Sequence, residues 1–181
     1  PRGRPCPERY VARLRRERGL PGRVGFFLGR LECRRNLVRL VRAFARLDLS
    51  DVHLVLAGAK GWYFEGILAE VARLGLEDRV HLPGYVTSES LPFWYNAASV
   101  FAYPSIYEGF GIPVLEALAC GIPTLTSSTT SLPEAGGDAT LQVSPLDEEA
   151  IATGLYRLLT DDELREEARV RGLAHASNFS W

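Results

Sequence analysis

Short runs of apolar and β-branched residues alternate along the chain with stretches in which apolar residues recur every three or four positions. The short runs predict six strands, at Val24–Leu28, Val52–Ala57, Val80–Leu82, Val100–Tyr103, Thr124–Thr126 and Ala139–Val143. The longer stretches predict helices at Asn36–Leu47, Phe64–Leu74, Glu89–Ala97, Pro113–Cys120, Glu148–Leu159 and Asp162–Ala176. Because strands and helices alternate, we expect an α/β fold with a doubly wound parallel sheet, of the Rossmann-like type.

The two ends of the chain differ from this pattern. Prolines at positions 1, 5, 7 and 21 flank an arginine-rich helical segment, Glu8–Arg18. We therefore expect residues 1–22 to be a linker helix that leads into one domain at residues 23–181. Near the other end, Thr160–Glu163 predicts a helix start, because aspartate is a favoured N-cap and acidic side chains stabilise the first turn.

The composition is that of an ordinary folded domain. Of the 181 residues, 46% are hydrophobic and 24% are charged, which excludes intrinsic disorder as the main state. The net charge of -1 gives no overall basic field that would attract nucleic acid. No apolar run approaches the roughly 20 residues of a membrane-spanning helix, so we expect no transmembrane segment.

Cysteine and methionine usage adds two expectations. Cys6, Cys33 and Cys120 lack zinc-site spacing and are odd in number, which favours reduced thiols in a cytoplasmic protein. The chain contains no methionine, and we therefore expect it to be a fragment of a longer protein.

In an open parallel sheet, ligands bind beyond the carboxyl ends of the strands, so the loops after the strands matter most. The loop Gly29–Asn36 follows the first strand and contains Arg30 and Arg34. A guanidinium beside a helix start suits phosphate, which leaves phosphate binding and plain exposure equally open for Arg30 and favours exposure for Arg34. Lys60, in the glycine-flanked second loop, is explained slightly better by an exposed turn position than by contact with an anion.

The loop after the fourth predicted strand carries the strongest signal. Gly109 and Gly111 let the backbone approach a ligand closely, and the free N–H groups of the following helix turn suit a diphosphate. Glu108 and Glu116 would repel phosphate, so we expect them to bind hydroxyls, such as those of a ribose and a hexose on either side of the diphosphate. Glu116 stands among apolar neighbours and therefore needs a polar partner.

These motifs together make the sequence resemble the C-terminal, donor-binding half of the family 4 retaining glycosyltransferases of the GT-B fold, over about Val24 to Trp181. The pair Glu108 and Glu116, with seven residues between them, is the hallmark of that family. The other matching segments are Gly29-Arg30 with Arg35-Asn36, Ala57-Gly58, Gly84-Tyr85-Val86, Tyr103-Pro104-Ser105, Tyr107 to Gly111, Glu116 to Gly121 with Pro123, and Leu132-Pro133-Glu134.

The resemblance implies a role for each matching residue. Arg30 and Arg35 would hold the donor diphosphate, and Glu108 would bind the transferred sugar, so these three form the catalytic set. The implied donor-binding set is Gly29, Lys60, Tyr85, Val86, Leu91, Gly109, Phe110, Gly111, Ile112, Val114 and Glu116. Within it, Glu116 would bind the ribose, and the segment around Tyr85 would frame the base mainly through its backbone. The family usually has lysine where this chain has Arg35, so a planar guanidinium replaces a point charge.

The resemblance also implies the reaction. A hexose would pass from a nucleotide diphosphate to an acceptor with retention, and GDP-mannose is favoured over UDP-glucose or UDP-N-acetylglucosamine. No cofactor or metal is implied, and the chain has no Asp-x-Asp motif. The acceptor (a glycan, a lipid or a small molecule) would bind an N-terminal lobe that is absent here, so we expect the isolated fragment to be inactive. We expect the domain in the cytoplasm, with the full-length protein there or at the membrane periphery.

Other functions share parts of this pattern. An NAD-dependent oxidoreductase would carry GxGxxG after the first strand, and a P-loop enzyme would carry GxxxxGK[ST]; the chain has neither. A related GT-B enzyme, such as a sugar phosphorylase or a nucleotide-sugar epimerase, stays open. A non-catalytic nucleotide-sugar-binding module also stays open, although intact Glu108, Glu116 and Arg30 argue against a degenerate lobe.

Two further groups of residues are expected to be structural. The histidines lie outside the loops discussed above, which favours structural or exposed positions for His53, His81 and His175. The aromatic run Trp62–Phe64 is expected to anchor the start of a helix.

Overall fold

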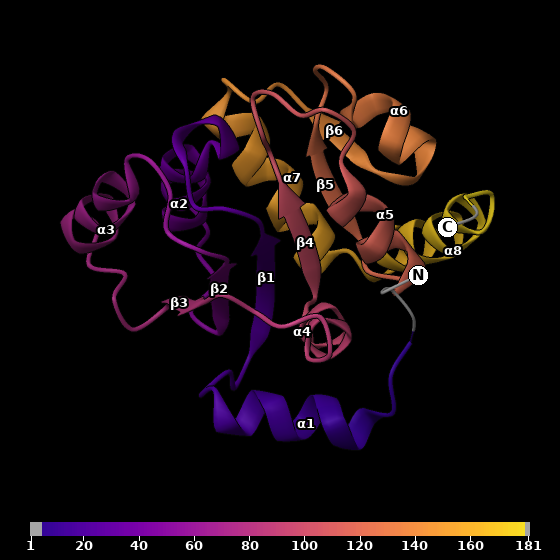
Figure 1. Cartoon of the computed structure of the whole chain (residues 1–181), viewed down its shortest axis with the longest axis horizontal. Coiled ribbons are helices and arrows are strands. Elements are labelled where there is room, and N and C mark those ends of the chain that lie inside the picture. Colours follow the sequence, from indigo (N-terminus) through magenta and orange to yellow (C-terminus); the bar gives the residue numbers. More distant parts are fainter. Residues whose placement is uncertain (1–4, 180–181) are drawn as a thin grey trace.

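A six-stranded parallel sheet forms the centre of the protein (Figure 1). The structure is a computed structural model, and it describes residues 5–179. In spatial order the strands are β3 (Val80–Gly84), β2 (Val52–Ala57), β1 (Arg23–Leu28), β4 (Val100–Tyr103), β5 (Thr124–Ser127) and β6 (Leu141–Val143). All neighbouring pairs are parallel, which confirms the predicted doubly wound α/β sheet.

Helices cover both faces of the sheet. They are α1 (Glu8–Glu17), α2 (Leu37–Ala45), α3 (Phe64–Arg73), α4 (Leu91–Ala97), α5 (Ile112–Ala119), α6 (Leu132–Gly136), α7 (Glu148–Thr160) and α8 (Asp162–Ser177). Helix α2 packs against α3 and α7, whereas α5 packs against α6 and α8. The connections between parallel strands are right-handed, so the face on which a helix lies depends on the direction in which the chain crosses the sheet. That direction reverses between β3 and β4, and the helices that connect β4, β5 and β6 therefore cover the other face. None of the helices within residues 5–179 has the length and apolar character needed to cross a membrane.

The central strands are buried on both faces, as their continuous apolar runs predict. All four residues of β4 are buried, and an aromatic cluster connects β4 to its neighbours. The Phe101 ring lies 5.9 Å from Phe26 of β1, 5.5 Å from Tyr95 of α4 and 5.5 Å from Tyr103, measured between ring centres. This packing fixes the carboxyl ends of β1 and β4 relative to each other.

Strands β1 and β4 are adjacent in the sheet although β2 and β3 lie between them in the chain. The loops that leave β1 and β4 therefore run toward opposite faces. In open α/β sheets this reversal point is where ligands bind, so the loops after β1 and β4 define the region of interest.

The structure corrects several local predictions. The strand predicted at Ala139–Val143 begins only at Leu141, because Gly137–Ala139 form a 3-10 turn in which Gly137 has a positive φ of 50°. Helix α6 has no counterpart among the predicted elements, since five residues are too few to show a helical period. At the start of α3 only Phe64 is buried. Trp62 and Tyr63 are 80% and 69% exposed, so the predicted anchoring is wrong for these two residues.

The N-terminal helix packs onto α4. Arg15 holds the N-terminal helix in this position, because its guanidinium donates hydrogen bonds to Ala97 O at 2.7 Å and to Gly22 O at 3.0 Å. A helix thus occupies the predicted arginine-rich segment, and the division into a leader at 1–22 and a domain at 23–181 stays a prediction. Residues 1–4 and 180–181, which belong to those two ranges, lie outside the described residues.

Candidate functional site

Backbone hydrogen bonds join the loops at the carboxyl end of the sheet. In the loop after β1, the Leu31 N–H donates to Ala59 O at 2.9 Å, and the Gly61 N–H donates back to Leu31 O at 3.0 Å. The Ile106 N–H, in the loop after β4, donates to Arg34 O at 2.9 Å. The loops after β1, β2 and β4 therefore form one connected surface.

The side chain of Asn36 also links these loops. Its buried side-chain Nδ2 donates to Pro104 O at 3.0 Å and to Pro145 O at 2.6 Å. The residue has a left-handed φ of 62°, a conformation that asparagine tolerates better than most residues. Asn36 thereby fixes the backbone next to Arg35 against the end of β4.

Arg35 and Glu108, both predicted site residues, form an ion pair between the loops after β1 and β4. Only 12% of the Arg35 side chain and 7% of the Glu108 side chain are exposed, so water screens this pair weakly. Arg35 Nη1 also donates to the Tyr103 hydroxyl oxygen at 2.6 Å. Burial raises the pKa of the Tyr103 hydroxyl, which keeps this group neutral beside the guanidinium.

The loop after β5 holds Glu108 through its backbone. The Glu108 N–H donates to Thr130 Oγ1 at 3.3 Å, and the Ser131 hydroxyl donates to Glu108 O at 3.0 Å. The position of this backbone is therefore set independently of the ion pair that its side chain makes.

The turn that starts α5 presents N–H groups beside Glu108. Gly111 has a φ of 103°, and a Cβ there would lie 2.7 Å from a methyl group of Leu132, so the turn requires glycine. In the described part of the chain, the N–H groups of Gly109, Phe110 and Gly111 have no hydrogen-bond partner. The Val114 N–H is not available in this way, because it donates to Gly111 O at 2.9 Å. Such a turn before a helix favours an anion.

The second predicted carboxylate, Glu116, lies one turn further along α5 and is buried, 6% exposed. It has the polar partner that its apolar surroundings require, because the Tyr95 hydroxyl of α4 donates to Glu116 Oε2 at 3.0 Å. The prediction of a polar partner is thus confirmed.

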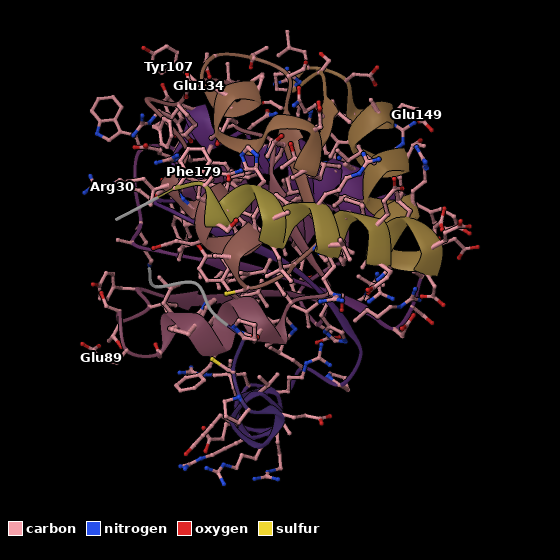
Figure 2. The ribbon with its side chains drawn as sticks, turned by 90° about the vertical axis from the view of Figure 1, so that its right-hand side faces the viewer. Arg30, Glu89, Tyr107, Glu134, Glu149 and Phe179 are labelled. Atoms are coloured by element: carbon pink, nitrogen blue, oxygen red, sulfur yellow. The ribbon has the colours of Figure 1, made fainter. Side chains whose placement is uncertain are left out.

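The remaining polar residues of the predicted set are exposed. Arg30, Lys60 and Tyr85 all reach the surface, and the Lys60 ammonium lies 4.8 Å from the centre of the Phe64 ring. Figure 2 shows the side chains of Arg30, Tyr107, Glu134 and Phe179 toward one side of the molecule and Glu149 on the opposite side.

The apolar members of the predicted set divide into buried and exposed residues. The side chains of Leu91 and Val114 lie in the core, away from solvent, and the partly buried Val86 packs against that core. Ile112 is 48% exposed, and the Phe110 ring contacts Phe179 with 6.3 Å between ring centres. The ligand contacts assigned to these residues stay predictions.

Gly29 lies beneath the Arg35 side chain. Its φ is 153°, and a Cβ built there would lie 3.2 Å from the Phe27 ring and 3.6 Å from Arg35 Nε. The missing side chain therefore leaves room for the guanidinium at the end of β1.

Several residues of the site have no sequence signal that assigns them to it. The hydroxyls of Tyr95 and Tyr103 contact the predicted charged residues, but both tyrosines look like core residues in the apolar pattern. Phe179 reaches Phe110 from the far end of the chain. A buried carboxylate does call for a hydroxyl donor, and only the fold reveals which tyrosine supplies it.

The site combines the Arg35 guanidinium, the free N–H groups of Gly109–Gly111 and the buried carboxylates of Glu108 and Glu116. Cations and N–H groups suit phosphate oxygens, and carboxylates accept hydrogen bonds from hydroxyls. Within residues 5–179 no group of three or more His, Cys, Asp or Glu side chains is placed to hold a metal ion.

Comparisons with known proteins show what this chain is similar to in sequence and in fold. The sequence model of the family described as Glycosyl transferases group 1 matches residues 11–173. The O-antigen chain mannosyltransferase B of Escherichia coli is 43% identical over 158 residues, which are 86% of this chain and 42% of that protein.

Solved structures share the fold. HepE from Anabaena, in complex with UDP and glucose, superposes with a TM-score of 0.88 at 22% identity, over 96% of this chain and 48% of that one. The C-terminal domain of a glycosyl transferase group 1 family protein (LpcC) from Francisella tularensis gives a TM-score of 0.83 at 22% identity, over 97% of this chain and 94% of that domain. The chain thus spans less than half of the mannosyltransferase and of HepE.

Proposed function

Because the chain belongs to the glycosyl transferases group 1 family, as its sequence predicts, we propose that it is the donor-binding domain of a hexosyltransferase. It would bind a nucleotide diphosphate sugar at the carboxyl ends of β1 and β4. The observation that carries this proposal is the Arg35–Glu108 pair beside the free N–H groups of Gly109–Gly111. The guanidinium suits the diphosphate, and the carboxylate suits the hydroxyls of the sugar.

The proposed reaction exchanges one bond at the anomeric carbon for another. The bond from this carbon to the diphosphate oxygen breaks, and the acceptor hydroxyl oxygen bonds to the carbon on the same face of the ring, which gives retention. The hydroxyl proton passes to the departing diphosphate or to solvent. Arg30 and Arg35 stabilise the charge that grows on the diphosphate, while Glu108 orients the sugar and Glu116 binds the ribose.

We favour mannose carried on GDP as the donor. The support for this choice is the 43% identity to the Escherichia coli mannosyltransferase. UDP-glucose is the second candidate, because HepE, which has the same fold, is solved with UDP and glucose.

The acceptor, a glycan, a lipid or a small molecule, would bind a part of the protein that this chain does not contain. The chain spans only 42% of the mannosyltransferase, so we propose that it binds donor weakly and transfers nothing alone. No metal or other cofactor is part of the proposal. The three cysteines, odd in number and without zinc-site spacing, support a reducing, cytoplasmic location.

Calorimetric titration with GDP-mannose, UDP-glucose and NAD tests this function. We expect saturable binding of one nucleotide sugar, no binding of NAD, and affinity at least about ten-fold lower in Glu116→Ala, which loses charge-assisted hydrogen bonds to the ribose. Glu149→Ala on α7 is the control, because Glu149 lies on the side of the molecule opposite Arg30 and Tyr107 (Figure 2). Binding of NAD, or equal binding by Glu116→Ala, contradicts the donor site. Sugar transfer by this chain alone contradicts the proposed inactivity.

A further inference from the structure

We propose that Arg35 exchanges Glu108 for the donor diphosphate, so that the Glu108 carboxylate becomes free for the sugar only when a diphosphate is bound. This inference rests on the function proposed above. It makes Arg35 and Glu108 the pair that selects ligands carrying a diphosphate and a sugar together.

Without a ligand, the charges of Arg35 and Glu108 neutralise each other in an ion pair. The Glu108 carboxylate accepts from Arg35 Nη1, and both side chains are buried. A free sugar therefore meets a carboxylate that is already occupied. Because the sugar is uncharged, it competes poorly with a guanidinium for that carboxylate.

Arg35 can release Glu108 without losing its own position. Its Nη1 has a second partner in the Tyr103 hydroxyl at 2.6 Å. Its Nε is buried and makes no hydrogen bond to any atom of residues 5–179, and the nearest Glu32 oxygen lies 3.8 Å away. The guanidinium thus has a donor that Glu108 leaves unsatisfied, and a diphosphate offers several acceptor oxygens and a larger charge than one carboxylate.

Glu108 also stays in place after release. Its N–H and C=O groups are held by Thr130 and Ser131 of the loop after β5, so only the side chain has to turn. The free N–H groups of Gly109–Gly111 follow directly in the chain. The released carboxylate therefore remains beside the atoms that face the donor.

The exchange predicts opposite effects of Glu108→Gln on two ligands. The neutral amide no longer holds Arg35, so the affinity for GDP or UDP, whichever base the protein accepts, should rise at least about five-fold. The same variant loses the carboxylate that binds sugar hydroxyls, so its affinity for GDP-mannose or UDP-glucose should fall relative to the diphosphate without sugar. Titration calorimetry with these four ligands measures both effects.

A double-mutant cycle separates release of Arg35 from a general loss of negative charge. In an Arg35→Gln background the guanidinium is already gone, so adding Glu108→Gln should leave the diphosphate affinity unchanged. Glu70→Gln is the matched control, because Glu70 of α3 is equally buried and also holds arginines, Arg42 and Arg73. It should alter neither affinity, and circular dichroism verifies that each variant is folded.

The outcomes distinguish this inference from the function on which it rests. Tighter binding of the diphosphate by Glu108→Gln, abolished in the Arg35→Gln background, supports the exchange. Equal or weaker binding of the diphosphate by Glu108→Gln, or a gain that persists without Arg35, overturns the exchange alone. If the wild-type chain binds none of the four ligands, the proposed function and the exchange are both wrong.

Discussion

The Tyr95 hydroxyl of α4 donates to the Glu116 carboxylate of α5 at 3.0 Å, in the interior of the protein. The same hydroxyl lies 3.3 Å from Pro113 O, in the first turn of α5. Burial, and then the nearby Glu116 charge, raise the pKa of Tyr95 far above its usual value, so the hydroxyl stays a donor at every physiological pH. One side chain thus positions both the carboxylate and the helix start of the candidate site.

Removing this hydroxyl should weaken both the fold and the site. In Tyr95→Phe the buried Glu116 carboxylate loses the Tyr95 hydroxyl as a donor, and we expect the free energy of unfolding to fall by about 1–2 kcal/mol. Nucleotide-sugar affinity should fall as well, because the Glu116 carboxylate is less well oriented. Urea unfolding and calorimetric titration measure the two effects. Tyr156→Phe, at a 48% exposed position of α7, is the control and should change neither; unchanged values in Tyr95→Phe would refute the role.

Phe179, just after the end of α8, should support the turn at Phe110. The Phe179 ring lies 6.3 Å from the Phe110 ring and 5.2 Å from the His175 ring, and His175 Nε2 lies 2.9 Å from Ala135 O. In Phe179→Ala we expect nucleotide-sugar affinity to fall by up to about five-fold, since an edge-to-face ring contact is worth about 1 kcal/mol. Phe179→Leu should recover part of the affinity.

The control for Phe179 is a change on α8, the helix that ends two residues before it. Val170 is 54% exposed, and Val170→Ala should leave nucleotide-sugar affinity unchanged. If Phe179→Ala binds the donor as the wild-type chain does, the C-terminal segment does not act on the turn.

Gly58 should be among the least replaceable residues of the loops. Its φ is 144°, and a Cβ there would lie 1.9 Å from Gly29 O, so the loops after β1 and β2 would have to separate. We expect Gly58→Ala to lower the free energy of unfolding by about 3 kcal/mol or more. Gly66→Ala in α3 is the matched control, because nothing lies within 4 Å of that Cβ. There, alanine should stabilise by about 0.5–1 kcal/mol. Thermal unfolding of both variants decides whether the close approach or glycine replacement in general is responsible.

The histidine pair of β2 and β3 should make stability depend on pH. His53 Nδ1 lies 2.9 Å from His81 Nε2, an arrangement in which one ring donates and the other accepts. Burial lowers the pKa of both rings, with Arg79 adding to the effect at His53 and His53 at His81, while Asp51 opposes it at His53. Protons therefore bind the unfolded chain more readily than the folded one.

The direction of the pH effect follows from these lowered pKa values. Above the histidine pKa of the unfolded chain, about 6.5, the rings are neutral in both the folded and the unfolded state, so their titration does not lower the stability. As the pH falls below that value the unfolded chain gains protons first, so stability decreases until the folded-state pKa values are passed. Urea midpoints between pH 8 and pH 4.5 should fall in the wild-type chain and fall less in a His53→Gln, His81→Gln double variant. Equal pH profiles would show that the pair does not titrate.

The apolar pattern predicts much of the fold because the buried strands of this protein can be recognised from short stretches of sequence. The strands Val52–Ala57 and Val100–Tyr103 have the predicted bounds, since a buried strand is an apolar run between polar turns, which His53 alone interrupts here. The pairing of His53 with His81 is different. It depends on the register of β2 against β3, where Val55 pairs with His81, and register is not visible in the spacing of single residues.

The candidate site also contains residues that the sequence identifies and residues that only the structure identifies. Glu108 and Glu116 are identifiable because a carboxylate beside glycines or among apolar neighbours is unusual in itself. Their partners are identifiable only in space: Arg35 comes from the opposite side of the reversal point, and Tyr95 comes from a different helix. Trp62 and Tyr63 show the converse, because their aromatic character predicts burial and the turn before α3 leaves them exposed.

The adjacency of β1 and β4 also bears on how the chain is synthesised. During translation β1, β2 and β3 emerge before β4, so we expect the edge of β1 that pairs with β4 to stay open until β4 has left the ribosome. That edge belongs to the strand Arg23–Leu28, whose interior is apolar and fully buried in the finished fold. An uncovered apolar edge strand can pair with another nascent chain, so we expect the growing polypeptide to be prone to aggregate in the interval between the synthesis of β1 and that of β4, the two strands that frame the candidate site.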